Sequence, residues 1–478
     1  MENNLRSRSA KGIFWSAVDY FFKQGIQLVI SFIIARMLHP SDYGLIAMVW
    51  IFIDIGNKLV DSGFSNALIQ KQDRTQIDYS TVFYFNIFIS IIIYLIIYIS
   101  APAIASFYKC QELDLILKIL SLVIVVNSFA AVQKTILTIN FDFKRLAKIS
   151  VAAGLLSGGA ALYLAYSDCG VWTLVTQQIV MSIITTALFW YTSTWHPILR
   201  FSLRSFNSLF GFGSKLLAGA LIHSLYTNLY SLIIGKTFSA SQLGFYNRAN
   251  SIAQLPADNI TTVFERVTYP IECELQDDNQ RLSAAFCKFI RMASYILFPV
   301  MFCIISVAAP LVKLVLTDKW LPCVPFLQLI CIAHMFLPIM RMNWNLLNAK
   351  HRSDFSLKAE IIKKAVAFLI LFVSYRFGVL YICLGMIAYS LSDWYIVTRY
   401  TKRVVPSVTL SKQVLDIAPI LIISIFSSVM SYGAQLLSLD SGSRLFVGVL
   451  VFATSFLILS KVTRRKEYQE IVQLIKRK

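Results

Sequence analysis

Charged residues are scarce in this chain, and their scarcity excludes an ordinary soluble protein. Only 14% of the 478 residues are Asp, Glu, Lys or Arg, whereas 57% are hydrophobic. Soluble globular domains carry about 25% charged residues. No polar segment between the apolar runs is long enough for a soluble catalytic domain, because domains are typically at least about 50 residues long.

Acidic residues are especially few, and the basic excess has a pattern. The chain has 25 acidic and 44 basic residues, for a net charge of +19. Lys and Arg gather in alternate loops, as in the stretches 6–11, 71–74, 144–148, 200–204, 281–291, 350–352, 402–412 and 461–466. This asymmetry is typical of cytoplasmic loops and predicts that both termini face the cytoplasm. Because the charge follows the topology, no nucleic-acid partner is expected.

Motifs of soluble catalysis are missing as well. The eight cysteines are scattered without a CxxC spacing, so neither a disulfide framework nor a metal site is expected. The sequence also has no P-loop, no GxSxG elbow and no HExxH motif. We therefore expect no catalytic residues, no ATP-driven pump and no cofactor. A gradient of H⁺ or Na⁺ stays open as the energy source.

Long apolar runs dominate what is present. Many approach the roughly 20 residues that a helix needs to cross a bilayer. They predict an all-α integral membrane protein with about fourteen transmembrane helices, near residues 12–35, 43–67, 81–101, 113–137, 149–166, 171–191, 208–234, 243–267, 287–309, 322–347, 357–376, 378–400, 413–434 and 442–460.

The chain also contains an internal repeat with a period of 200 residues. Residues 33–36 (IIAR) match residues 233–236 (IIGK). The same shift pairs Ser41 with Ser241, and Gly44 with Gly244. Six predicted helices separate the copies, and an even number keeps them parallel in the membrane, as in transporters that are built from two similar halves.

Polar side chains form stripes at helical spacing in five predicted helices. The most polar helix is near 243–267, where side chains three and four residues apart share one face. The stripes contain the charged or polar residues Asp19 and Lys23; Asp54, Lys58, Asp61 and Ser65; Lys215 and His223; Asn247, Asn250, Gln254 and Asp258; and His334 and Arg341. Such groups are costly in lipid, so we expect the helices to meet around a common interior.

Other interpretations of these charges stay open. Asp19 and Lys23, like Asp54 and Lys58, are spaced for ion pairs within one helix, and such pairs need no ligand. Arg341 has the position of a side chain that reaches toward the membrane surface, and Arg248 is close to an outer helix end.

Three sequence blocks carry a resemblance to a known family. They are AKGIFWSAVDYFFKQGIQLVISFIIARMLHPSDYGLIAM, DSGFSNALIQK and SQLGFYNRANSIAQLP. The blocks resemble those of bacterial polysaccharide transporters, the lipid-linked oligosaccharide flippases of the superfamily that includes multidrug and toxin extruders. The resemblance implies two six-helix bundles around a central cavity, alternating access and two additional C-terminal helices. The expected boundaries are 1–191 for the first bundle, 192–207 for a cytoplasmic connector, 208–400 for the second bundle, and 401–478 for the last two helices and a basic tail.

The implied substrate is an undecaprenyl-diphosphate-linked oligosaccharide for O-antigen, capsule or exopolysaccharide synthesis. Cavity residues that would contact its diphosphate or sugars are Lys23, Lys58, Lys215, Arg248, Asn250, Gln254, Asp258 and Arg341. Coupling candidates are Asp19, Asp54, Asp61 and His223. The expected location is the bacterial cytoplasmic (inner) membrane, with membrane lipid as surroundings. A polysaccharide polymerase and a chain-length regulator are candidate partners.

Three rival functions are weighed against the flippase. A drug or ion antiporter of the multidrug and toxin extrusion type would favour an acidic, aromatic cavity, whereas lysines and aspartates are mixed here. A polysaccharide polymerase or ligase would be expected to have a sizeable external loop, and the loops here are short. A membrane scaffold would leave the duplicated polar stripes without a purpose.

Overall fold

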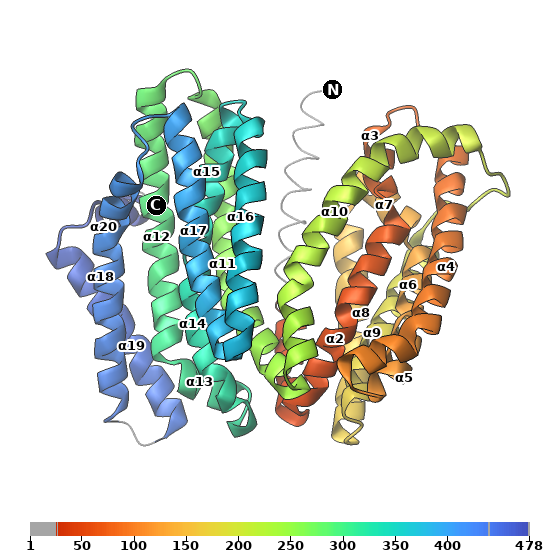
Figure 1. Ribbon diagram of the computed structural model, residues 1–478, viewed down its shortest axis with the longest axis horizontal. Coiled ribbons are helices and arrows are strands. Elements are labelled where there is room, and N and C mark those ends of the chain that lie inside the picture. Colours follow the sequence, from red (N-terminus) through yellow and green to blue (C-terminus); the bar gives the residue numbers. More distant parts are fainter. Residues whose placement is uncertain (1–24, 26, 438–439, 477–478) are drawn as a thin grey trace. The chain divides into compact units, whose positions relative to one another are not determined.

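The computed structural model describes residues 25, 27–437 and 440–476. Figure 1 shows the described chain as helices joined by short turns, without a strand in these ranges. An apolar helix at Gln27–Met37 comes first. The helices that follow are α2 (Pro40–Asp61), α3 (Phe64–Gln70), α4 (Gln76–Tyr108), α5 (Glu112–Leu120), α6 (Leu122–Ser128), α7 (Ala131–Ile139), α8 (Phe143–Tyr166), α9 (Val171–Thr192), α10 (Leu203–Thr237), α11 (Ala240–Glu274), α12 (Asn279–Ser306), α13 (Ala308–Val315), η1 (Asp318–Cys323), α14 (Val324–His334), α15 (Leu337–Ala349), α16 (Ser353–Ser374), η2 (Tyr375–Phe377), α17 (Val379–Val404), α18 (Leu410–Gln435), α19 (Ser441–Val462) and α20 (Lys466–Lys476).

The prediction of an all-helical membrane protein is confirmed. Within the described ranges, ten helical segments are long and apolar enough to cross a membrane. An eleventh consists of Glu112–Ser128 and Ala131–Ile139, which are bent by 43° at a short break. Large apolar side chains such as Ile99, Leu155 and Phe446 are exposed on these helices, as expected for surfaces that contact lipid rather than water. The chain is a multi-pass membrane protein.

The described chain forms two compact units, Met1–Gly244 and Phe245–Lys478. In the first unit α10 packs against α2, α3 and α4. In the second unit α18 packs against α12 and α19, and α16 packs against α17. The first unit extends beyond the expected connector, since α10 follows that connector yet packs against helices that precede it. The predicted bundle boundaries at 191 and 208 stay a prediction.

The segment expected to be a connector, residues 192–207, is fixed to the start of α4. Gln76 accepts a hydrogen bond from the Trp195 indole Nε1 (2.7 Å), and its own amide donates to the His196 carbonyl (2.7 Å). The Ser80 hydroxyl accepts from the Ile198 backbone N–H at 3.0 Å. Trp195 is 9% exposed and packs among apolar residues of the first unit, so it anchors this segment to that unit's core.

The two turns of the sequence repeat contact each other reciprocally within the first unit. A Cβ atom added at Gly44 would lie 1.8 Å from the carbonyl oxygen of Ala240. A Cβ atom at Gly244 would lie 1.9 Å from the carbonyl oxygen of Pro40. The repeat of 200 residues relates Gly44 to Gly244 and Pro40 to position 240, so the contact has the symmetry that two equivalent helix starts require. Only glycine permits this approach of the backbones.

Candidate functional site

The centre of the candidate site is an ion pair within α2. Lys58 Nζ lies 2.8 Å from Asp54 Oδ2, one helical turn away. The side chains are 29% and 28% exposed, so both charges are half-buried in a segment that crosses the membrane. The spacing alone predicts this pair, because side chains four residues apart meet on a helix.

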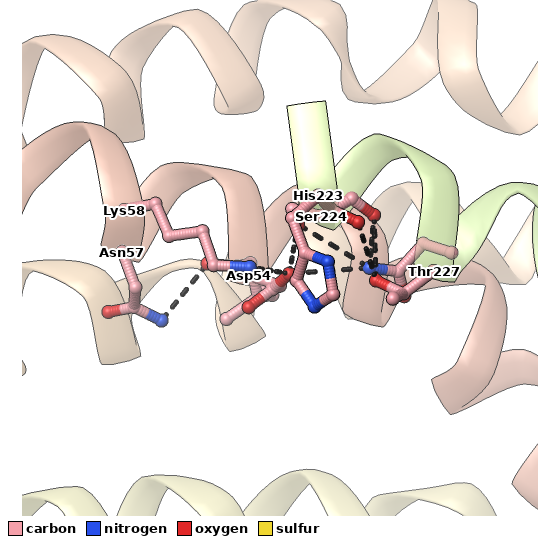
Figure 2. A network of polar contacts seen from close by, with 8 residues as sticks. Asp54, Asn57, Lys58, His223, Ser224 and Thr227 are labelled. Atoms are coloured by element: carbon pink, nitrogen blue, oxygen red, sulfur yellow. Dashed lines mark hydrogen bonds and ion pairs between the residues drawn. The ribbon is translucent and has the colours of Figure 1, made fainter. Parts of the chain in front are cut away.

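Helix α10 supplies two further donors to the same carboxylate. The Ser224 hydroxyl donates a hydrogen bond to Asp54 Oδ2, and the Asn228 side-chain amide donates to it at 3.3 Å. Figure 2 shows Asp54 of α2 between Lys58 and the α10 side chains, with His223 and Thr227 beside them. Three donors on one oxygen stabilise its negative charge. The predicted coupling residue Asp54 therefore joins α2 to α10.

The neighbouring Asn57 of α2 joins two other helices through neutral groups. The Asn127 amide on α6 donates to Asn57 Oδ1 at 3.2 Å. The Ser182 hydroxyl on α9 donates to Asn127 Oδ1 at 2.6 Å. The chain of hydrogen bonds thus runs from α2 through α6 to α9. Asn57 was absent from the predicted stripe, although it lies three positions after Asp54 on the same helix. Its connection to α6 and α9 depends on how those helices pack, which the sequence of α2 does not contain.

Asp61, the second acidic residue of the α2 stripe, has a different environment. Its Oδ1 accepts hydrogen bonds from the hydroxyl and the backbone N–H of Ser65, across the break between α2 and α3. Thr135 Oγ1 on α7 in turn donates to Ser65 Oγ at 3.2 Å. The break between the two helices depends on Gly63, whose φ of 74° is a left-handed conformation that favours glycine. A Cβ atom at this position would also lie 2.4 Å from the carbonyl oxygen of Gly213.

A polar ladder follows α11 in the second unit. Asn250 donates to Gln254 Oε1 at 3.2 Å, and Gln254 donates to Asp258 Oδ2 at 2.8 Å. His334 Nε2 at the end of α14 lies 3.0 Å from Asn250 Oδ1. Four residues of the predicted stripes are thus brought together. Apart from the Asp258 carboxylate, the ladder consists of two amides and an imidazole, so it offers hydrogen bonds more than charge.

The remaining predicted residues are dispersed. Arg248 is 8% exposed, with its guanidinium 5.6 Å from the ring centroid of the buried Trp320. Lys215 and His223 are exposed on α10, and Arg341 is exposed on α15. Asp19 and Lys23 lie outside the described residues.

A charged cluster in the second unit was missed by the sequence analysis. Lys363 of α16 lies 3.0 Å from Asp393 of α17 and 3.2 Å from Glu360. Lys364 lies 3.2 Å from the same Glu360. Each charge could have been found by its position inside an apolar run. The pairing of Lys363 with Asp393 across two helices is visible only in the tertiary structure.

A buried amide, Gln413, was also missed. Its Oε1 accepts from Asn343 at 3.0 Å and from the Trp394 indole at 2.8 Å, and its amide donates to Asn343 Oδ1 at 3.2 Å. These contacts join α15, α17 and α18. Gln413 is 1% exposed, so the network is structural.

In residues 25, 27–437 and 440–476, no three His, Cys, Asp or Glu side chains gather in a way that would hold a metal ion.

Curated relatives extend over most of this chain. It is 26% identical over 462 residues to the teichuronic acid biosynthesis protein TuaB of Bacillus subtilis, a match that covers 95% of this chain and 96% of TuaB. It is 27% identical to the lipopolysaccharide biosynthesis protein WzxC of Escherichia coli, over 75% of this chain and 74% of WzxC. The succinoglycan biosynthesis transport protein ExoT of Rhizobium meliloti is 23% identical over 68% of this chain and 65% of ExoT.

Solved structures share the fold. The lipid II flippase MurJ in an inward closed conformation matches 96% of this chain and 99% of its own length, with a TM-score of 0.76 and 12% identity. An inward-facing multidrug resistance transporter of the MATE family matches 81% of this chain and 98% of its own length, with a TM-score of 0.63 and 14% identity. The chain therefore shares the fold of this flippase and of this transporter.

The family profile described as "Polysaccharide biosynthesis protein" matches residues 33–325, more than half of the chain. The matched stretch includes all of α2, α10 and α11, and thus the Asp54–Lys58 site and the α11 part of the polar ladder. The resemblance that the sequence blocks indicated is confirmed. This chain belongs to the polysaccharide biosynthesis protein family.

Proposed function

We propose that this protein is a flippase that moves polyprenyl-diphosphate-linked oligosaccharides across the bacterial cytoplasmic membrane by alternating access. The family, the names of the relatives and the likeness to a lipid II flippase support this proposal. The diphosphate and sugars of such a lipid are charged and hydrated, so they do not cross about 30 Å of hydrocarbon unaided. A protein with polar groups inside its membrane segments supplies the missing contacts.

The observation that carries the proposal is the half-buried ion pair of α2. A charge inside a membrane segment is costly and commonly marks a substrate or ion path. Lys58 Nζ is bound by Asp54 but keeps 29% of its side chain exposed, so an incoming phosphate oxygen has access to it. Asp54 is also bound by Ser224 and Asn228, so it stays stabilised when Lys58 turns to the phosphate. Lys58 thus receives the anion, and Asp54 holds the lysine in the empty state.

Other polar groups complete the proposed substrate path. The ladder of Asn250, Gln254 and Asp258 offers amide and carboxylate partners for sugar hydroxyls. Lys215, exposed on α10, would add positive charge for the diphosphate, and Lys23, Arg248 and Arg341 are the further proposed cations. Asp19, Asp61 and His223 stay proposed coupling residues. Whether these groups share one cavity stays a prediction.

The proposed number of membrane helices is fourteen. Three predicted spans stand apart from the eleven that length and apolar composition support. The first runs largely through residues outside the described ranges and continues as the short apolar helix Gln27–Met37. The second is α11, whose polar stripe lowers its hydropathy. The third is α16, which carries Lys358, Glu360, Lys363 and Lys364. In the second and third, polar residues lower the hydropathy, and such residues inside a membrane are proposed to face protein or a water-filled cavity rather than lipid.

The proposed topology has both termini in the cytoplasm and the protein in the inner membrane. It rests on the loop asymmetry of Lys and Arg. Labelling of single cysteines in a cysteine-free variant tests it. Position 351 should be inaccessible to a membrane-impermeant reagent in intact cells, whereas position 109 should be labelled. The reverse pattern would contradict the topology.

The function is tested by replacing Lys58. In the Lys58→Gln variant, surface polysaccharide should be lost while the protein stays in the membrane at its normal level, because the diphosphate loses its cation. Lys58→Arg should keep part of the export, since the charge is retained in a different geometry.

A matched control exists in the same unit. Lys118 and Asp114 on α5 form an ion pair with the same spacing and the same 2.8 Å distance, with side chains 23% and 34% exposed. Lys118→Gln should leave export unchanged, because the pair lies near the expected outer surface and its loss costs little. Normal export by Lys58→Gln would refute the assigned role. The alternative is a drug or ion antiporter of the multidrug and toxin extrusion type. In that case the protein should lower cellular drug accumulation, and deletion of its gene should leave surface polysaccharide intact.

Polysaccharide polymerase and chain-length regulator are the proposed protein partners. They would act on the lipid-linked unit after it has crossed. The energy source is proposed to be a gradient of H⁺ or Na⁺, because the chain has no ATP-binding motif.

A further inference from the structure

A second charged site lies deep inside the second unit, outside the α2 site. Lys363 is the tenth residue after Ser353 at the start of α16, and at 1.5 Å per residue it is about 15 Å into the helix. Half of a bilayer's hydrocarbon thickness is also about 15 Å. Asp393 lies near the middle of α17. The charges are therefore near mid-membrane depth, where each is expensive to maintain.

The geometry of the cluster leaves Asp393 as its weakest-held charge. Lys363 and Asp393 side chains are only 10% and 8% exposed, and Lys363 Nζ also lies 5.2 Å from the Trp344 ring centroid on α15. Glu360 is held by two ammonium groups, at 3.2 Å each, and is 35% exposed. Among the ion pairs of the described residues, Asp393 has Lys363 as its partner and shares it with Glu360. Its buried Oδ1 lies 3.0 Å from Nζ but makes no aligned hydrogen bond to a described residue.

The groups that act on Asp393 all come from α16. Its charged neighbours are Lys363, Glu360 and Lys364. Of the other helices that pack on α17, α15 faces the cluster with Trp344, α14 has its His334 directed to Asn250, and α18 has its Asp416 paired with Arg291. With two lysines protonated and two acids ionised, the cluster carries no net charge.

We propose that Asp393 is a proton-binding site and that its protonation is coupled to movement of α16 against α17. A proton from water forms an O–H bond with the carboxylate, and Lys363 keeps its own proton and its contact with Glu360. The cluster then carries one net positive charge. A net charge at this depth is unfavourable, so the protonated cluster favours a state in which Lys363 reaches water. Release of the proton restores the neutral pair and the packed helices.

The cluster fits a proton better than a sodium ion. The position beside Asp393 Oδ1 is occupied by the Lys363 ammonium at 3.0 Å. A metal cation there would meet a like charge at short range in a medium of low dielectric. The coupling of the proton to export rests on the proposed function. The binding of the proton to Asp393 does not, because it is a property of the protein without substrate.

Infrared spectroscopy of the purified full-length protein tests the binding. As the pH is lowered, the carbonyl band of protonated, buried carboxylic acids should grow in the wild type, and the component that belongs to Asp393 should be missing in Asp393→Asn. The band should be the same in sodium chloride and in choline chloride. Asp416→Asn is the control, because that carboxylate is paired with Arg291 on α12 and should not contribute to the band. An identical titration in wild type and Asp393→Asn would overturn the proposal, as would suppression of the band by sodium.

A paired substitution separates coupling from a structural role. The double variant Lys363→Met/Asp393→Asn removes both charges, and neutral replacement of a buried pair is commonly tolerated. It should insert at the wild-type level but lose surface polysaccharide. Normal export by this variant would show that the pair is structural and would overturn the coupling. Surface polysaccharide that survives deletion of the whole gene would instead refute the proposed function, independently of proton binding.

Discussion

The reciprocal glycine contact between the two repeat turns gives the sharpest prediction of stability. In Gly44→Ala, the new Cβ would lie 1.8 Å from the Ala240 carbonyl oxygen, and in Gly244→Ala it would lie 1.9 Å from that of Pro40. Real Cβ atoms do not approach other atoms within 3.0 Å, so the backbones must separate by more than about 1 Å at either site. Because the neighbouring atom is backbone, no side chain can move aside to relieve the clash.

The expected magnitude follows from two effects. Overpacking of a tight contact costs about 1–3 kcal/mol. The glycine hydrogen that Cβ replaces points at the oxygen, and loss of such a C–H···O contact adds roughly 0.5–1 kcal/mol. Each substitution should therefore lower the free energy of unfolding of the first unit by about 1.5–4 kcal/mol. The double variant should cost less than twice as much, because the separation that one alanine forces also relieves the other.

The assay is thermal unfolding of the purified protein in one detergent, read as Tm and as the monodisperse fraction after heating. Gly154→Ala on α8 is the matched control, because its Cβ would have nothing within 4 Å. The control should be neutral or slightly stabilising, since alanine favours a helix over glycine. Equal Tm values for Gly44→Ala and Gly154→Ala would refute the close contact. Strictly additive effects of Gly44→Ala and Gly244→Ala would refute their reciprocity.

Three further predictions concern polar groups. Gln413→Leu should destabilise the second unit by about 2–3 kcal/mol, because it leaves the buried Asn343 and the Trp394 indole without their partner; an unchanged Tm would contradict this. Ser224→Ala should weaken export less than Lys58→Gln, since it removes one of three donors to a carboxylate, and equal loss in both would show that the hydroxyl contacts substrate. Asp440 accepts hydrogen bonds from the hydroxyl and the backbone N–H of Ser443 and from the backbone N–H of Gly442. These bonds lower the pKa of Asp440 below its usual 3.8. The stabilisation that Asp440 gives as the N-cap of α19 should therefore be complete above pH 3.8 and be lost only as the pH falls below that value. Asp440→Asn should abolish this pH dependence in an unfolding titration.

The sequence by itself determined the class, the order of the helices and the family. Apolar runs of span length, a basic excess in alternate loops and the repeat of 200 residues are each written in the residue order, and all are local or periodic signals. The Asp54–Lys58 pair belongs to the same kind, because one helix brings together residues four apart. The α11 ladder of Asn250, Gln254 and Asp258 was predictable for that reason too.

Only the tertiary structure decided which helices supply the partners. Ser224 reaches Asp54 across 170 positions in the chain, and Asp393 meets Lys363 across two helices, so no spacing rule connects them. Arg248, whose substrate role stays a prediction, is buried against Trp320 of η1, a contact that no spacing in α11 indicates. Periodicity specifies the face on which a side chain lies. What that face contacts depends on the packing of the other helices, which the order of residues in one helix does not contain.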